Sequence, residues 1–353
     1  MTDTAAVPAD PDHVLFERRG RALIITLNRP AQLNALNRGM CDRIQQALYT
    51  GMADAEVALV VIQGAGERAF CAGGDVVDVY HAGRAGSIAW EDFFHDEYRM
   101  NQTIAVYPDP YVALLDGVTM GGGVGLSIHG RYRVATERTL FAMPETGIGL
   151  IPDVGGTYAL PRLPGEIGTW AALTGARLGA ADCVYAGIAT HYLPSERLAL
   201  LRELLAEGTE PVEQVLATLH VDPGEAPLAT VRDAIDFHFL HDSVEAILAS
   251  LAEGDEWALA QHATIARMSP TSLKLTLRAL RLGASESIEA ALRTEYRVVC
   301  QIKHGHDFYE GVRAQLIDKD KAPIWSPATL AEVDAAALDR YFAAPAGGDL
   351  NFE

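Results

Sequence analysis

Unbroken apolar runs alternate with glycine-rich turns in the first half of the chain. VALVVIQG (57–64) and YVALLDG (111–117) are the clearest of these runs. Such continuous runs are typical of strands that are covered on both faces, as in a mainly parallel sheet. Further strand-like patterns lie at residues 14–27, 131–136 and 139–143.

Apolar residues at helical spacing lie between these strands and dominate the rest of the chain. RGMCDRIQQALYTGM (38–52) and residues 88–106 show this spacing, and from about residue 165 the pattern is mainly helical. Strand, turn and helix alternate to about residue 190, which indicates the α/β class with an added helical layer.

The change of pattern also suggests how the chain is organised. We expect an α/β core at residues 13–195 and a helical C-terminal region of the same functional unit at 196–343. The polar or glycine-rich ends, 1–12 and 344–353, are expected to be flexible tails.

Composition and charge narrow the classes of partner. Of the 353 residues 49% are hydrophobic, which permits a large core, and the net charge is −19. An acidic surface repels phosphate backbones, so neither nucleic acid nor an anionic membrane is expected as a partner. The four cysteines are scattered and read as free thiols. With no signal-peptide pattern at the start of the sequence, a cytoplasmic protein is expected.

Two glycine-rich turns, FCAGGD (70–75) and GGGVG (121–125), each follow a buried strand. Neither contains a dinucleotide-binding or P-loop signature. Glycine alone is equally compatible with a tight turn where a helix packs close to a strand. Taken together, the two turns can offer one N–H each to a single carbonyl oxygen, which would form an oxyanion hole.

The segment MPETGIGLIPDVGG (143–156) carries two acids, Glu145 and Asp153, among apolar residues and glycine. Its glycines and proline make a continuous helix unlikely to form, so a loop can turn both carboxylates toward one cavity. Burial would raise a carboxylate pKa toward that of a general base. The alternative is structural, with each acid capping a helix. For Glu97, in FFHDEYRM, a solvated helix face is the default expectation.

These segments together resemble the crotonase (enoyl-CoA hydratase/isomerase) superfamily, and most of all its 3-hydroxyisobutyryl-CoA hydrolase branch. The matching pieces, in chain order, are NRPAQLNALN, GAGERAFCAGGD, ALLDGVTMGGGVGL and MPETGIGLIPDVGG, followed by SPTSLKLTLRAL and EYRVVCQIKHGHDFYEGVRAQLIDKDKAPIW. The likeness covers about residues 14–342. It implies a spiral of ββα turns with a helical C-terminal region, and an acyl-CoA thioester as substrate.

The resemblance also implies roles for single residues. The backbone N–H groups of Ala72 and Gly122 would form the oxyanion hole, Glu145 and Asp153 would be catalytic, and Glu97 would contact the substrate. In the hydratases a glutamate follows the GGG turn by two residues, where this chain has Gly125. No metal and no cofactor is expected beyond the coenzyme A of the substrate, and homo-oligomer formation stays open.

Three functions are therefore considered. The first is hydrolysis of a 3-hydroxyacyl-CoA thioester, in which Glu145 either attacks the carbonyl or activates water. The second is an enoyl-CoA isomerase or hydratase of the same fold, and the third is a non-catalytic acyl-CoA-binding protein. Arg29 and Arg68 are candidates for contacting the CoA phosphates.

Overall fold

The computed structural model describes residues 10–352, and the chain forms two compact units. The first unit comprises the chain up to Leu140 together with Ala189–Pro223. The second comprises Phe141–Ile188 together with the chain from Gly224 onward. The chain thus returns to the first unit after an excursion, and neither unit ends at the boundary expected between residues 195 and 196.

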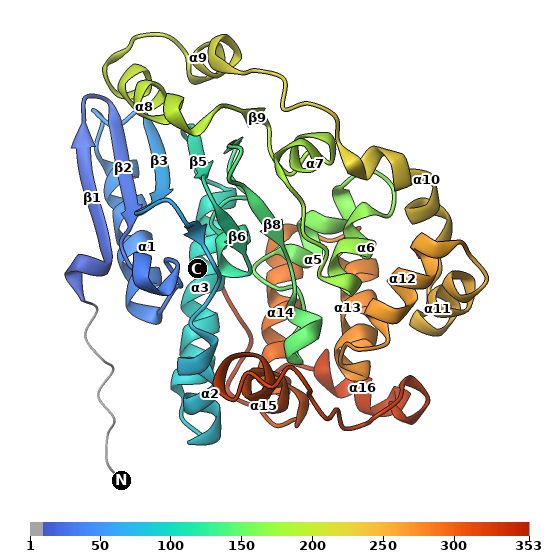
Figure 1. Ribbon diagram of the computed structural model, residues 1–353. Helices are drawn as coiled ribbons and strands as arrows, with labels where there is room; N and C mark the ends of the chain where they lie inside the picture. The colour runs from blue at the N-terminus through green and yellow to red at the C-terminus, as the bar shows by residue number, and fades with distance from the viewer. Residues whose placement is uncertain (1–9, 353) are drawn as a thin grey trace. The chain divides into compact units, whose positions relative to one another are not determined.

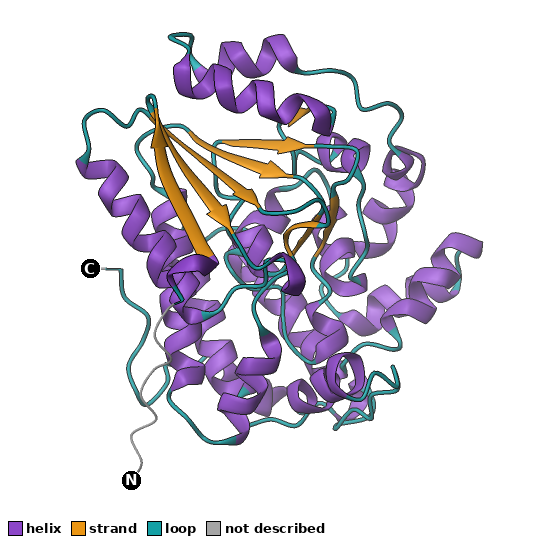
Figure 2. Cartoon of the chain, turned by 60° about the vertical axis from the view of Figure 1, so that its left-hand side comes forward, coloured by secondary structure: helices purple, strands orange, loops and turns teal. Residues whose placement is uncertain are grey.

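The first unit is built on a six-stranded sheet with the order β1-β2-β3-β5-β7-β9. β1 pairs with β2 in the antiparallel sense, and the remaining neighbours are parallel. Figure 2 shows these strands fanning out side by side. The elements of this unit are β1 (Val14–Arg19), β2 (Ala22–Leu27), α1 (Arg38–Ala53), β3 (Leu59–Gly64), β4 (Ala69–Cys71), α2 (Val76–Arg84), α3 (Ala89–Ala105), β5 (Tyr111–Leu115), β6 (Val118–Met120), α4 (Gly122–Gly125), β7 (Tyr132–Ala135), β9 (His191–Tyr192), α8 (Leu198–Glu207) and α9 (Val212–Leu219).

Both faces of this sheet are covered, which explains the unbroken apolar runs of its strands. On one face Ile24, Val61 and Leu114 belong to a cluster with residues of α8 and α9, such as Leu201 and Leu216. The alternate residues of β2 are also buried, and α1 contacts β1 and β2. Figure 1 shows α1 beside these strands and α8 and α9 at their upper ends. The expected α/β class is confirmed.

Two short strands of the first unit lead directly into the glycine-rich turns. β4 and β6 pair in parallel, with Ala69 opposite Val118 and Cys71 opposite Thr119. Because parallel strands end at the same edge of a sheet, the turns that follow them start as neighbours. This pairing places FCAGGD beside GGGVG.

The second unit is almost entirely helical, as expected for the later part of the chain. None of the helices in the part of the chain that the structure describes could cross a bilayer. β8 (Leu140–Ala142) lies where the chain enters this unit. The helices are α5 (Gly156–Ala159), α6 (Ile167–Thr174), α7 (Ala180–Tyr185), α10 (Pro227–Phe239), α11 (Val244–Ala252), α12 (Glu256–Ile265), α13 (Pro270–Gly283), α14 (Ile288–Ile302), α15 (Asp307–Val312) and α16 (Ala335–Tyr341), with a 3₁₀ turn at Glu145–Ile148.

The C-terminal segment differs from the expected flexible tail. Leu350 is only 1% exposed. Arg297 of α14 forms an ion pair with Asp349, and the Nε of Arg293 donates to the carbonyl oxygen of Leu350 at 3.1 Å. The burial of one leucine and two arginine contacts therefore anchor residues that composition alone marks as a tail. The expected N-terminal tail, 1–12, lies largely outside the described residues.

Candidate active site

The motif NRPAQLNALN holds the chain that leads into FCAGGD. Leu33 and Asn34 have positive φ angles of 52° and 58°, so the backbone turns sharply here. The buried Asn34 side chain donates from Nδ2 to the carbonyl oxygens of Ala65 (3.0 Å) and Ala69 (2.9 Å). One amide group thereby fixes both ends of the connection between β3 and β4.

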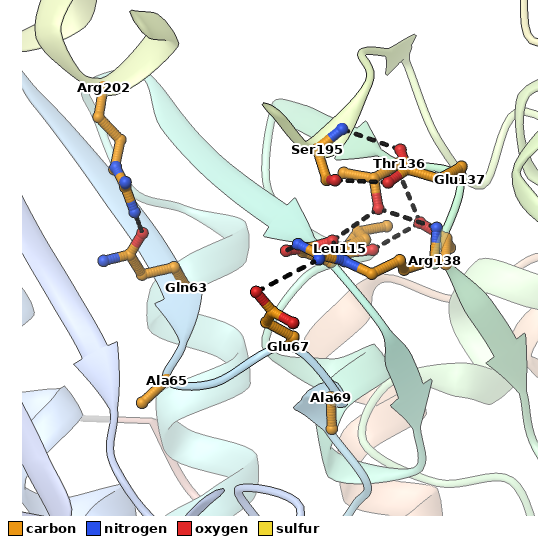
Figure 3. A network of polar contacts seen from close by, with 12 residues as sticks. Gln63, Ala65, Glu67, Ala69, Leu115, Thr136, Glu137, Arg138, Ser195 and Arg202 are labelled. Carbon is orange, nitrogen blue, oxygen red and sulfur yellow. Dashed lines mark hydrogen bonds and ion pairs between the residues drawn. The ribbon is translucent and has the colours of Figure 1, made fainter. Parts of the chain in front are cut away.

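A further set of contacts surrounds this connection (Figure 3). The Arg138 guanidinium pairs with Asp116 and lies 4.0 Å from a carboxylate oxygen of Glu67. The Glu137 carboxylate accepts hydrogen bonds from the backbone N–H (2.8 Å) and the hydroxyl of Ser195. These contacts join the loops after β3, β5 and β7 within the first unit.

The backbone of FCAGGD shows which peptide group can serve as a donor. The N–H of Ala72 donates to the carbonyl oxygen of Leu33 at 3.0 Å, and the carbonyl oxygen of Gly73 accepts from Leu36 at 2.8 Å. Among residues 10–352 no backbone hydrogen bond uses the N–H of Gly74. The N–H of Ala72, expected as a donor, is therefore already engaged in the fold, whereas the N–H of Gly74 is the one left for such a role.

The second donor position, Gly122, lies beside Gly74. Gly121 has a φ of +48°, and Gly122 begins α4, so its N–H has no partner within that helix. A Cβ atom built on Gly122 would lie 3.3 Å from the Gly74 nitrogen. The two peptide groups are thus close neighbours, as donors to a single oxygen must be.

Glu97 is buried against this turn and does not lie on a solvated helix face. Its side chain extends from α3 and is 2% exposed. A Cβ atom on Gly122 would lie 2.5 Å from Glu97 Oε1, so the carboxylate occupies the space that a side chain at 122 would need. Burial, together with the nearby charge of Glu97, raises the pKa of Cys71 to about 12. The four cysteines are free, as expected, and the structure shows that all four are buried.

The two arginines considered for the CoA phosphates differ in their surroundings. Arg29 forms an ion pair with Asp75 (3.1 Å) and donates to the carbonyl oxygen of Ala35 (2.7 Å). These contacts give Arg29 a structural role next to the FCAGGD turn. Arg68 is exposed.

In the second unit, Glu145 is a buried acid within a loop. It begins a 3₁₀ turn that ends at Ile148, and Gly149 follows with a φ of +74°. The side chain is 5% exposed, and within the described chain Oε2 has no hydrogen-bond partner. Burial raises the pKa of Glu145 well above its ordinary value, and the charge of Asp153 adds to this effect. A buried carboxylate with a raised pKa and an unused oxygen is suited to accept a proton or to attack an electrophile.

Asp153 begins a tight turn of unusual geometry. The N–H of Gly156 donates to the Asp153 carbonyl oxygen at 2.6 Å, which closes a four-residue turn. Both central residues have positive φ, +54° at Val154 and +79° at Gly155, as in a type I′ turn. Positive φ is rare for a β-branched residue and costs about 1–3 kcal/mol. The expected alternative of a side-chain cap is not seen, since α5 has Gly155 at its N-cap and no side-chain cap bond.

A third buried acid, Glu295 of α14, supports this turn. It is fully buried, and it accepts hydrogen bonds from the N–H of Gly155 (2.7 Å), the N–H of Thr157 (2.9 Å) and the Thr157 hydroxyl (2.5 Å). Burial raises the pKa of Glu295 to about 8, with the charge of Asp153 contributing. The sequence interpretation missed this residue. The available signal was an acid at a position on the apolar face of α14, three residues after Leu292 and four before Val299.

Three buried acids of the second unit, Glu145, Asp153 and Glu295, are thus coupled, because the charge of Asp153 opposes ionisation of the other two. Across the residues described by the structure, no three His, Cys, Asp or Glu side chains are arranged so that they could hold a metal ion. The second unit also contains a cavity of about 350 Å³, lined among others by Gly149, Asp307 and Tyr341. None of the acids just described lines it.

Comparison with known proteins gives a consistent result. A family model described as Enoyl-CoA hydratase/isomerase matches residues 22–342. The mitochondrial 3-hydroxyisobutyryl-CoA hydrolase of Danio rerio is 50% identical, over 93% of this chain and 89% of that protein. The human protein of the same name is 46% identical, over 97% and 91%.

Solved structures show the same fold. A carnitinyl-CoA dehydratase from Mycobacterium thermoresistibile superposes with a TM-score of 0.92 at 44% identity, covering 97% of this chain and 99% of that chain. An enoyl-CoA hydratase from Rhodobacter sphaeroides 2.4.1 gives 0.89 at 41% identity, covering 96% and 100%. The crotonase-like fold implied by the sequence motifs is confirmed.

The comparisons also correct one expectation. A cytoplasmic protein was expected from the first residues of the sequence, whereas the hydrolases from Danio rerio, Rattus norvegicus and human are all named mitochondrial, which points away from the cytoplasm. The family itself is established by a model that spans most of the chain and by relatives close to half identical. The chain belongs to the enoyl-CoA hydratase/isomerase (crotonase) family.

Proposed function

We propose that this protein hydrolyses 3-hydroxyisobutyryl-CoA to 3-hydroxyisobutyrate and coenzyme A, a step of valine degradation. The observation that carries this assignment is the identity of 46–50% to proteins of that name over at least 93% of the chain. The buried Glu145 beside Asp153 supplies a carboxylate suited to the reaction.

The roles follow from the chemistry of thioester hydrolysis. The N–H groups of Gly74 and Gly122 stabilise the negative charge that develops on the thioester oxygen, an effect worth about 3–4 kcal/mol per donor. Glu145 then acts by one of two routes. As a base it takes a proton from water while hydroxide adds to the carbonyl carbon. As a nucleophile it forms an anhydride that water opens.

Both routes end in the same products. The C–S bond breaks, the sulfur leaves as thiolate and takes up a proton, and the acid is released. Asp153 would orient the water or the substrate hydroxyl, and Glu97 would contact the substrate. No metal or redox cofactor takes part. A single turnover in ¹⁸O-labelled water tests for the nucleophilic route, because ¹⁸O enters the Glu145 carboxylate only when water opens an anhydride at the carbonyl carbon of that residue.

A second candidate is hydration or dehydration of a CoA ester, since the two similar structures are named as a dehydratase and a hydratase. Residue 125 argues against it. The resemblance places a second catalytic glutamate of hydratases there, and this chain has a buried glycine in α4.

A substrate panel tests the assignment. The purified protein is incubated with 3-hydroxyisobutyryl-CoA and with crotonyl-CoA, and both free thiol and enoyl absorbance are followed. We expect thiol release from the hydroxy ester and no loss of enoyl absorbance. Loss of enoyl absorbance without thiol release would instead support the hydratase, and binding of both esters without turnover would support a non-catalytic protein.

A further inference from the structure

The turn that follows Asp153 is held by a carboxylate from a distant part of the sequence. Glu295 lies 142 residues after Asp153 and accepts two hydrogen bonds from backbone N–H groups, one at Gly155 and one at Thr157. A third hydrogen bond comes from the hydroxyl of Thr157 (2.5 Å). All of these atoms belong to the second unit.

This turn requires such support because of its own sequence. Val154 is 1% exposed and has a φ of +54°, a conformation that β-branched residues rarely adopt. A strained conformation persists only where its surroundings hold it in place. The contacts that hold it include the Gly156–Asp153 backbone bond at 2.6 Å and the hydrogen bonds to Glu295.

We propose that Glu295 is a positioning residue that fixes the Asp153–Gly156 turn and thereby sets the Asp153 carboxylate against Glu145. Glu295 does not itself touch the substrate. The role rests on the proposed thioester hydrolysis, in which Asp153 and Glu145 act together. Burying a carboxylate costs free energy unless hydrogen bonds offset the loss of water. Glu295 is fully buried, and among residues 10–352 the hydrogen bonds to its carboxylate all come from this one turn, which indicates that holding the turn is its role.

Conservative substitutions separate the contribution of the Glu295 carboxylate from that of the Thr157 hydroxyl bond. Glu295→Gln keeps the size of the side chain but replaces one acceptor oxygen by an NH₂ group, which then opposes an N–H donor of the turn. Thr157→Val removes only the hydroxyl bond, and Thr157→Ser retains it. Glu289→Gln, on the same helix α14 and only partly buried, is the matched control.

The experiment measures kcat and KM for thiol release from 3-hydroxyisobutyryl-CoA, the pH profile of kcat/KM, and the crystal structure of Glu295→Gln. We expect Glu295→Gln to lower kcat about tenfold or more with KM changed by less than about twofold, because small misplacements of catalytic groups reduce the rate steeply. The acidic limb of its pH profile should stay in place, since a Glu295 carboxyl with a pKa of about 8 is already uncharged at acidic pH. Thr157→Val should lose part of kcat, while Thr157→Ser and Glu289→Gln should behave as the wild type.

Wild-type kcat in folded Glu295→Gln would overturn the positioning role, as would a loss of kcat while the Asp153–Gly156 turn is unchanged in the crystal structure of the variant. If this variant does not fold, equal kcat values for Thr157→Val and Thr157→Ser overturn it instead. The proposed function fails separately, when the wild type releases no thiol. In that case the crystal structure of Glu295→Gln still decides, because an unchanged turn with Val154 at positive φ would contradict the inference.

Discussion

Replacing Glu295 with glutamine should flatten the pH dependence of the free energy of unfolding. Glu295 is fully buried, which raises its pKa to about 8 in the folded protein, whereas an unfolded glutamate has a pKa of about 4.3. Between these values the folded state binds a proton that the unfolded state lacks. The free energy of unfolding therefore falls as the pH rises from about 4 to about 8.

The size of the effect follows from the pKa difference. Each pKa unit corresponds to about 1.4 kcal/mol, so a rise from about 4.3 to about 8 corresponds to about 5 kcal/mol across this window. Glutamine cannot take part in this titration. The raised pKa of Glu145 acts in the same direction but is present in both proteins, so it largely cancels in their difference.

The assay is urea unfolding followed by circular dichroism at several pH values between about 5 and about 8. The difference in unfolding free energy between wild type and Glu295→Gln should shift with pH, in favour of the variant as the pH rises. Glu289→Gln serves as the control and should run parallel to the wild type. If the curves of Glu295→Gln and wild type run parallel as well, the reasoning from the buried carboxyl of Glu295 is refuted.

Two further predictions concern the proposed catalytic groups. Asp153→Asn removes the charge that adds to the raised pKa of Glu145, so the acidic limb of kcat/KM should move to lower pH; a shift to higher pH would contradict the coupling of the two acids. Gly122→Ala places a Cβ atom 2.5 Å from Glu97 Oε1 and should lower kcat about 10²–10³-fold. Gly179→Ala is the control, because the space around its Cβ position is open, and it should leave kcat unchanged. Equal kcat values for the two variants would show that the turn at Gly122 takes no part in the reaction.

The strands and helices of the first unit could be predicted from the sequence because their patterns are local. VALVVIQG contains β3 (Leu59–Gly64) and YVALLDG contains β5 (Tyr111–Leu115), while the helix expected at 38–52 is α1 (Arg38–Ala53). In each case the spacing of apolar residues within the segment itself predicts a buried strand or an amphipathic helix. The return of Ala189–Pro223 to the first unit is a tertiary feature that carries no such period.

In the candidate site, too, the features that depend on tertiary contacts could not be predicted from the sequence. The segments FCAGGD and GGGVG were identified correctly as adjacent turns, but the choice of Ala72 depended on which N–H is already engaged. That choice is decided by Leu33, almost 40 residues earlier in the sequence, whose carbonyl oxygen accepts from Ala72. Glu295 was missed for a related reason, since its partners Gly155 and Thr157 are remote in sequence and only the fold joins them.

The central claim is that the buried carboxylate of Glu145 drives hydrolysis of the thioester. Its most direct test is the kcat/KM for thiol release from 3-hydroxyisobutyryl-CoA by Glu145→Gln, with folding checked by circular dichroism. Loss of a general base or nucleophile should reduce this constant at least about 100-fold, since glutamine can neither accept the proton nor attack the carbonyl. Thiol release at the wild-type rate by the folded variant would contradict the claim.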